Sequence, residues 1–106
     1  MVEPAPRGRN PFDTTGVERG EDGIARYTGR PDSLVHLLRA SVERDAEAIA
    51  VAEVGGERLT YAELWERAER VAGGLHAEGV ERGDRVALRL PNGLDWVIAF
   101  WGIQLA

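Results

Sequence analysis

The sequence contains no cysteine and no lysine, and it holds only two histidines. Without cysteine, the chain can form no disulfide, no thiolate nucleophile and no cysteine-based metal site. All 13 basic residues are arginine, so Schiff-base chemistry and the lysine of a phosphate-binding P-loop are also excluded within these residues. These absences remove several classes of catalytic site from the 106-residue sequence.

Positive charge is in the minority. The sequence has 18 acidic residues against 13 basic ones, and its formal net charge is −5. Nucleic-acid binding needs clustered positive charge, so we expect no nucleic-acid partner. The longest apolar run, Trp96–Ile103, is far too short to cross a bilayer, and the N-terminus lacks the apolar region of a signal peptide. We therefore expect no transmembrane segment and a cytoplasmic location.

Residues 1–31 are rich in glycine, proline, arginine and acidic residues, and their apolar positions are scattered. This composition predicts a leader that is flexible or lies over the surface, with a short extended piece at Ile24–Tyr27. Residues 32–106 carry regular apolar patterns and are predicted to form part of a larger domain.

The first helix is predicted to begin at Asp32 or Ser33, because either side chain can cap the first turn. Its apolar positions recur at spacings of three and four and are Leu34, Leu37, Leu38 and Val42. His36 lies beside this stripe. With only His76 elsewhere in the chain, a metal site is not expected.

Two strands are predicted next, at Ala48–Val54 and Glu57–Leu59, joined by a tight turn at Gly55–Gly56. Neither a GxGxxG spacing nor a P-loop spacing surrounds the glycine pair. A turn therefore explains the pair better than phosphate binding does.

The clearest helix signal covers Leu59–Leu75. Thr60 and Glu63 have the spacing of a capping box, and Leu59 and Leu64 have the spacing of a hydrophobic staple. This pattern predicts a helix that begins at a defined residue and buries one apolar face.

Three glycines mark the end of this helix. Gly73 and Gly74 lie inside it, where each costs up to about 1 kcal/mol relative to alanine. We therefore expect another backbone to approach closely there. Gly79 is predicted to end the helix in the left-handed conformation that glycine tolerates best.

A third strand is predicted at Arg85–Leu90, where apolar residues alternate. Arg82–Asp84 spells a tripeptide known from cell-adhesion ligands, but a turn before a strand explains it better. Pro91 ends the strand, and Asn92 is predicted to cap a last helix.

That last helix, residues 94–106, is apolar nearly all round. A helix of this kind belongs inside a larger protein, and the sequence stops without the usual signals of a helix end. We expect either the remainder of a larger domain or a partner protein to cover it.

Several short motifs, in this order and spacing, resemble the opening of adenylate-forming, or AMP-binding, enzymes. They are Leu59–Leu64 (LTYAEL), Gly79–Val80, Gly83–Ala87 (GDRVA) and Leu90–Asn92 (LPN). The resemblance covers about residues 33–106 and is greatest to the acyl-CoA synthetases. It implies an α/β fold in which residues 32–106 are an N-terminal fragment of the large domain, truncated within the last helix. The implied order is helix-strand-strand-helix-strand-helix, with an incomplete sheet.

The activity that the resemblance implies is activation of a carboxylic acid by ATP and Mg²⁺, followed by thioester formation with coenzyme A. In the family, a Ser/Thr/Gly-rich loop, an aspartate and a late lysine bind the nucleotide and stabilise the transition state. All of these motifs follow the segment seen here. We therefore assign no catalytic, cofactor-binding or metal-binding residue to this chain, and we expect it to be inactive alone with a structural role.

Two alternatives remain open. The chain could be part of a peptide-synthetase adenylation domain, a related branch of the same family. It could also be a short non-catalytic protein that binds a partner through the apolar helix 94–106. A small independent enzyme is the least favoured interpretation, because the chain lacks cysteine, lysine and clustered histidines.

Overall fold

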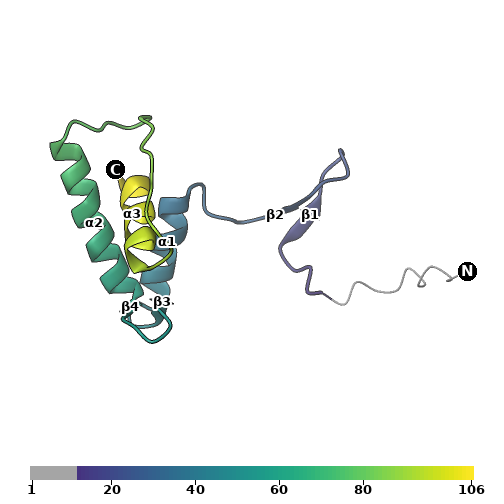
Figure 1. Cartoon of the computed structure of the whole chain (residues 1–106). Helices are drawn as coiled ribbons and strands as arrows, with labels where there is room; N and C mark the ends of the chain where they lie inside the picture. Colours follow the sequence, from purple (N-terminus) through teal and green to yellow (C-terminus); the bar gives the residue numbers. More distant parts are fainter. Residues whose placement is uncertain (1–11) are drawn as a thin grey trace, which may run out of the picture. The chain divides into compact units, whose positions relative to one another are not determined.

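The structure is a computed structural model, and it describes residues 12–106. The chain divides into two compact units, Met1–Arg30 and Pro31–Ala106 (Figure 1). The predicted leader 1–31 falls mostly in the first unit, and its first eleven residues lie outside the described residues. Whether the leader is flexible or lies over a surface stays a prediction.

The described part of the first unit is a small hairpin of β1 (Val17–Arg19) and β2 (Ala25–Tyr27). The two strands pair antiparallel, with Val17 opposite Tyr27 and Arg19 opposite Ala25. β2 lies in the extended piece predicted at Ile24–Tyr27. Two-stranded hairpins are marginal by themselves in water, so local polar contacts in the turn matter for this unit.

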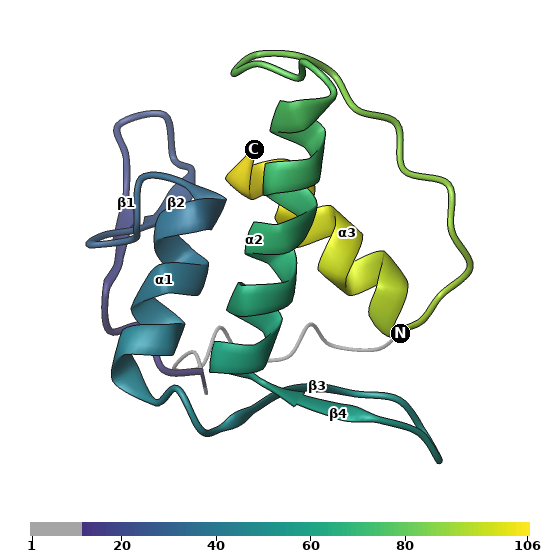
Figure 2. The ribbon, with the colours of Figure 1, turned by 90° about the vertical axis from the view of Figure 1, so that its left-hand side faces the viewer.

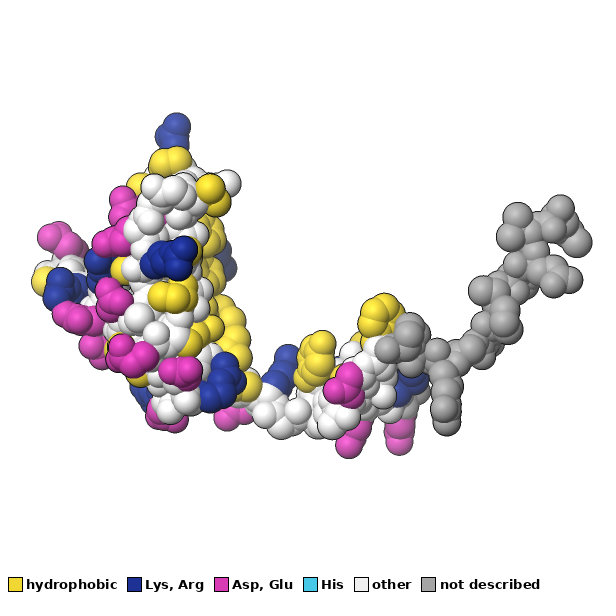
Figure 3. Space-filling model, turned by 90° about the horizontal axis from the view of Figure 1, so that it is seen from below, with side chains coloured by type: hydrophobic (Ala, Val, Ile, Leu, Met, Phe, Trp, Pro, Cys, Tyr) yellow, Lys and Arg dark blue, Asp and Glu magenta, His cyan; other side chains and the backbone are white. Residues whose placement is uncertain are grey.

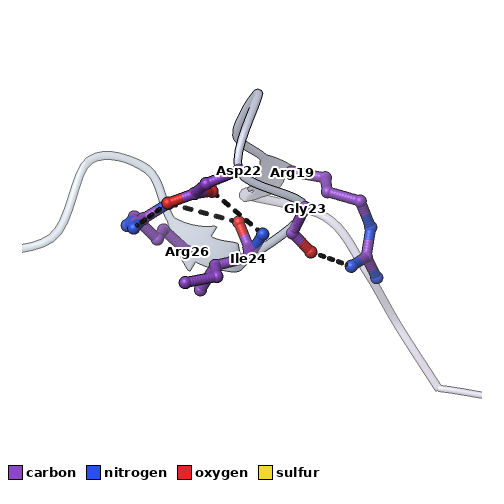
Figure 4. A network of polar contacts seen from close by, with 5 residues as sticks. All are labelled: Arg19, Asp22, Gly23, Ile24 and Arg26. Carbon is purple, nitrogen blue, oxygen red and sulfur yellow. Dashed lines mark hydrogen bonds and ion pairs between the residues drawn. The ribbon is translucent and has the colours of Figure 1, made fainter.

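Asp22 organises that turn (Figure 4). Its carboxylate accepts a hydrogen bond from the backbone N–H of Ile24 at 3.0 Å and forms an ion pair with Arg26 at 2.7 Å. The Arg26 guanidinium, together with the Ile24 N–H, holds the pKa of Asp22 below its ordinary value. Arg19 donates across the turn to the carbonyl of Gly23, which has a φ of +78°.

The second unit contains three helices and one hairpin. They follow the chain as α1 (Leu34–Arg44), β3 (Ile49–Ala52), β4 (Arg58–Thr60), α2 (Tyr61–Ala77) and α3 (Leu94–Leu105). Figure 2 shows α1 beside α2, α3 crossing α2, and the β3–β4 hairpin at the end where α2 begins. With two small antiparallel sheets among the described residues, the predicted α/β class with an incomplete sheet is confirmed.

The first helix begins where its side chains predict. Ser33, not Asp32, is the N-cap of α1, and its hydroxyl accepts a hydrogen bond from the His36 N–H at 3.2 Å. Only Leu38 in this helix is fully buried, while Leu34 and Leu37 are about half exposed. The apolar stripe of α1 is therefore covered along only part of its length.

The β3–β4 hairpin is antiparallel, with Val51 opposite Leu59 and an irregularity at Ala50. Gly55 lies in the connecting turn with a φ of +72°, as the predicted turn requires. The hairpin leads directly into α2, because Thr60 is both the last residue of β4 and the N-cap of the helix.

The ends of α2 agree closely with their prediction. The Thr60 hydroxyl accepts from the Glu63 N–H at 3.1 Å, and the Glu63 carboxylate accepts from the Thr60 N–H at 3.2 Å, which completes the capping box. At the other end Gly79 has a φ of +92°. The Val80 N–H donates to the Leu75 carbonyl and the Gly79 N–H to the His76 carbonyl, a Schellman motif.

The core of the second unit lies where α1, α2, α3 and β4 meet. Its buried apolar cluster consists of Leu38, Leu59, Leu64, Leu94 and Ile98. Leu59 and Leu64, the predicted staple pair, are both in this cluster, and Leu59 is the largest fully buried side chain.

Two expected features do not form. Residues 85–90 make no strand, because no other strand of the described chain lies alongside to complete a hydrogen-bonded ladder. Gly73 and Gly74 meet no neighbour: a Cβ built at either position has nothing within 4 Å. The expectation of close backbone packing at these two glycines is therefore wrong for this structure.

Candidate functional site

Two contacts of the second unit position α3, one at its start and one in its middle. The start of this helix is capped by a residue from the β3–β4 turn: the Glu53 carboxylate accepts a hydrogen bond from the Leu94 N–H at 3.0 Å. A carboxylate at a helix N-terminus satisfies a free N–H and interacts favourably with the helix dipole. The cap thus joins two segments that are far apart in the sequence.

Asn92 does not cap this helix, contrary to the prediction. The N-cap residue is Gly93, and it forms no side-chain cap. A Cβ at Gly93 would lie 2.7 Å from the Glu53 carboxylate, so the absence of a side chain there lets the carboxylate approach. Glu53 could not be predicted as the cap, because capping rules consider only neighbouring residues and Glu53 lies 41 positions before Leu94.

The middle of α3 packs closely against α2 at Gly102. This residue is buried, and a Cβ added to it would overlap Val71 and lie 3.1 Å from the Ala68 carbonyl oxygen. Gly102 therefore allows the close approach that was expected at Gly73 and Gly74. The sequence did contain a signal for this contact, since Gly102 is a small residue in a helix of otherwise larger apolar side chains.

The three aromatic residues of α3 contact one another in sequence. Trp96 stacks on Phe100 with ring centroids 5.4 Å apart, and Phe100 meets Trp101 edge to face at 5.3 Å. Trp96 is about one-third exposed. A half-open apolar groove of about 360 Å³ lies between α1, β3, α2 and α3, and Leu37, Val97 and Trp101 are among its lining residues.

The charged groups of α2 mostly form local pairs. Arg67 binds the Glu57 carboxylate through both terminal nitrogens, at 2.9 and 3.0 Å. This guanidinium holds the pKa of Glu57 below its ordinary value, and the carboxylate in turn raises the pKa of Arg67. Trp65 donates to Glu69 at 2.8 Å and lies under the Arg39 guanidinium.

The glycine pair at the β3–β4 turn is unsuited to phosphate. Glu53 and Glu57 flank it, and Figure 3 shows acidic side chains with arginines among them at this end of the unit. An anion at the turn would meet the Glu53 carboxylate, Arg67 is already bound to Glu57, and Gly55 is accounted for by its positive φ. The structure thus supports the turn interpretation.

The two histidines and the Arg82–Asp84 tripeptide lie at helix ends and in a turn. His36 is in the first turn of α1 and His76 is in the last turn of α2. Among residues 12–106, no three His, Cys, Asp or Glu side chains are placed to hold a metal ion together. Arg82–Asp84 is an exposed turn in which the Asp84 N–H donates to the Glu81 carbonyl at 3.1 Å and Gly83 has a φ of +94°.

The helices of the described chain are too short or too polar to span a bilayer.

Comparison with known proteins identifies three informative relatives. Triostin synthetase I of Streptomyces triostinicus is 43% identical over 80 residues, which are 76% of this chain and 15% of the relative. A salicyl-AMP ligase/salicyl-S-ArCP synthetase of Mycobacterium tuberculosis is 38% identical over 84 residues, 76% of this chain and 14% of the relative. A mitochondrial medium-chain acyl-CoA ligase of Danio rerio is 36% identical over 78 residues, 72% of this chain and 13% of the relative.

The chain spans only 13–15% of the length of these relatives. No solved structure matches it significantly. The protein family that matches is described as AMP-binding enzyme, and the match covers residues 38–106. These residues include the α2 capping box, the Gly79 helix end and the whole of α3. We conclude that this chain belongs to the family of AMP-binding enzymes.

Proposed function

We propose that this chain is the N-terminal part of the large domain of an ATP-dependent ligase that activates carboxylic acids. Such a ligase joins a carboxylate to the α-phosphate of ATP, releases pyrophosphate, and transfers the acyl group to a thiol with release of AMP. The family match over residues 38–106 is the observation that carries this proposal.

Within that ligase, we assign the chain a structural role. Its best-placed carboxylates are already engaged: Glu53 caps α3, Glu57 pairs with Arg67, and Glu63 completes the capping box of α2. These side chains fix helix ends and connect segments. Within the described residues, no three such side chains are placed to hold a metal ion together.

ATP and Mg²⁺ do not fit the residues described here. The glycine turn is flanked by acidic side chains, which would repel phosphate, and the carboxylates that could attract a cation serve as caps and ion-pair partners. We therefore assign no step of the reaction to the residues of this chain. The nucleotide, the metal ion and coenzyme A are expected to bind residues of the longer protein.

The proposal also concerns which thiol accepts the acyl group. We favour an acyl-CoA synthetase that works in the cytoplasm, in which coenzyme A takes the acyl group. The similarity to an acyl-CoA ligase supports this choice. A similarity of 36% identity over 83 residues to a hybrid PKS-NRPS synthetase of Aspergillus niger supports the alternative of a peptide-synthetase adenylation domain. Assaying the longer protein with coenzyme A and with a phosphopantetheinylated carrier protein would distinguish the two acceptors.

Titration calorimetry with MgATP tests the structural role directly. We expect no heat of binding when MgATP is added to the 106-residue chain. Saturable binding would contradict the role, because it would place part of a nucleotide site here. The ligase assignment is tested separately, by reading the gene beyond codon 106. A Gly-rich Ser/Thr loop and a late lysine are expected there, and their absence would refute the assignment.

A second candidate is a short protein that binds a partner through α3. The exposed Trp96 and the open groove beside Trp101 favour it. In the ligase, the remainder of the large domain would cover this face instead. Analytical ultracentrifugation of the 106-residue chain tests the second candidate, since a monodisperse, well-folded monomer would exclude it.

A further inference from the structure

Asn92 and Gly93 lie directly before α3, and the two groups that could react with one another there are both unbound. The Asn92 side chain is exposed and forms no hydrogen bond within the described chain. The Gly93 N–H likewise donates to no group among residues 12–106, although the Gly93 carbonyl accepts from the Val97 N–H at 3.3 Å. The Asn92 side-chain amide and the Gly93 nitrogen are therefore free to approach one another.

Glycine at position 93 belongs to the cap of α3. A Cβ at this position would lie 2.7 Å from the Glu53 carboxylate oxygen that accepts the bond from the Leu94 N–H. The same lack of a side chain leaves the Gly93 nitrogen uncrowded, and glycine has the widest choice of backbone conformations. The contact that holds α3 thus places the most permissive residue directly after an exposed asparagine.

We propose that Asn92–Gly93 is a site of spontaneous covalent modification, at which Asn92 is converted to aspartate and isoaspartate. The Gly93 nitrogen loses its proton to solvent base and attacks the Asn92 Cγ atom, and the new bond closes a succinimide ring. The bond from Cγ to the side-chain nitrogen breaks, and that nitrogen leaves as ammonia with protons taken from water. The ring closes readily because both reacting groups are held next to one another in the chain.

Water then opens the ring at either of its carbonyl carbons. Addition at Cγ gives aspartate, whereas addition at the main-chain carbonyl gives isoaspartate, in which the backbone runs through the former side chain. The overall change consumes water and replaces an amide by a carboxylate and ammonium. No oxidant, reductant or enzyme is required, and the inference is independent of the proposed ligase function.

The isoaspartate product would disturb the cap of α3. It adds a methylene to the main chain immediately before Gly93, the residue that the Glu53 carboxylate approaches. A longer main chain shifts Gly93 relative to this carboxylate, so the Leu94 N–H is expected to lose its acceptor. Slow chemistry at position 92 would in this way release the first turn of α3 from the β3–β4 turn.

Peptide mapping of the 106-residue chain, incubated at neutral pH, tests the modification. Trypsin cleaves after Arg89 and releases residues 90–106 as a single peptide, in which Asn92 is the only asparagine. We expect the mass increase of an amide-to-acid conversion in this peptide, and fragmentation should place it at Asn92 and not at Gln104. Asp-N protease, which cleaves before aspartate but not before isoaspartate, separates the two products.

The chain contains its own control in Asn10, the only other asparagine. Asn10 is followed by Pro11, whose nitrogen carries no hydrogen and cannot close the ring. The tryptic peptide of residues 10–19 should therefore keep its amide. Asn92→Gln is a matched variant, because glutamine keeps the amide but would have to close a larger and less favourable ring. It should stay unconverted at position 92 while the parent becomes half converted.

The open arrangement of the site is tested by comparing the folded chain with the same chain unfolded in urea. Neither reacting group is held in the fold, so the two conversion rates should agree within about tenfold. A folded chain that converts more slowly than this would overturn the proposal, because the fold would then protect Asn92. The absence of conversion in the 90–106 peptide, or equal conversion at Asn10, would overturn it as well.

Hydrogen exchange measured by NMR reports the effect on the cap. In the purified isoaspartate form, the Leu94 amide should exchange about fivefold faster than in the fresh chain, as expected for loss of an N-cap acceptor. In Glu53→Ala the same amide should already exchange at the faster rate and should not change on conversion. An unchanged Leu94 rate in the isoaspartate form of the parent would refute the release of the cap.

Discussion

Glu53 and Leu94 are joined by a hydrogen bond of 3.0 Å from the Leu94 N–H to the Glu53 carboxylate, although 41 positions separate them in the sequence. The bond ties the β3–β4 turn to the first turn of α3. It also shows why Gly93 stands immediately before the helix, because a Cβ there would lie 2.7 Å from the same carboxylate oxygen.

Glu53→Ala is expected to destabilise the chain by about 1 kcal/mol, the usual cost of losing an N-cap acceptor. Glu53→Gln should cost less, about 0.5 kcal/mol, because the amide oxygen still accepts the bond while the interaction of the charge with the helix dipole is lost. Urea unfolding would measure both. Glu47→Gln, in the turn between α1 and β3, is a control that should stay close to the parent protein. Equal effects at positions 47 and 53 would argue against the cap.

Gly102→Ala should destabilise the chain by about 2 kcal/mol, because the added methyl overlaps Val71 and approaches the Ala68 carbonyl. Val71→Ala removes the obstructing Cγ1 atom but keeps the Cβ, which the added methyl also overlaps, so the double variant should recover only part of the loss, about 0.5 kcal/mol. A double-mutant cycle of unfolding free energies measures this coupling. Strict additivity of the two changes would show that α3 does not pack on Val71 in this way.

Gly73→Ala should have the opposite sign and stabilise the chain by about 0.5–1 kcal/mol. Gly73 lies inside α2, and a Cβ at this position meets no atom within 4 Å. The comparison of Gly73→Ala with Gly102→Ala therefore uses one substitution at two helical glycines that differ in their surroundings. Thermal unfolding would rank the three proteins, with the position 73 variant highest. A lower melting temperature for that variant than for the parent would mean that the space beside α2 is occupied.

Glu57→Gln should lower stability at neutral pH but not in acid. The Arg67 guanidinium depresses the pKa of Glu57 in the folded state, so the pair contributes stability above the ordinary glutamate pKa of about 4.3. That contribution disappears as the pH falls through the lower pKa of the folded protein, where the carboxylate becomes protonated.

Melting temperatures of the parent and the Glu57→Gln variant, followed from pH 7 to pH 2, would measure this effect. The difference between them is expected to be small, since the pair is solvent exposed, and to vanish at the acid end. Arg67→Gln should reproduce the neutral-pH loss. A difference that persists unchanged at pH 2 would assign the effect to something other than the ion pair.

Features that depend on neighbouring residues could be read from the sequence. The capping box of Thr60 and Glu63, the Ser33 cap and the left-handed Gly79 each involve contacts within a few positions, so the residue types alone specify them. The staple residues Leu59 and Leu64 likewise follow from their spacing. The family resemblance rests on these same local motifs, and it is confirmed by the match over residues 38–106.

Features that depend on distant segments could not be read in this way. Asn92 was the cap that local rules favour, but the β3–β4 turn brings Glu53 to the start of α3. Close packing was expected at Gly73 and Gly74, but α3 crosses α2 where Gly102 meets Val71. Both outcomes depend on how two helices and a hairpin meet in space, which local spacing does not encode.

The sequence by itself determined where α1 and α2 begin, where α2 ends and which family the chain belongs to, because these caps, the glycine end and the short motifs are local. Only the tertiary structure decided which carboxylate caps α3, which glycine lets two helices approach, and that residues 85–90 have no partner within the described chain. A helix contains its own backbone hydrogen bonds, whereas a strand obtains them from another segment. For this reason the alternating pattern at 85–90 predicted the faces of a strand but could not supply its ladder.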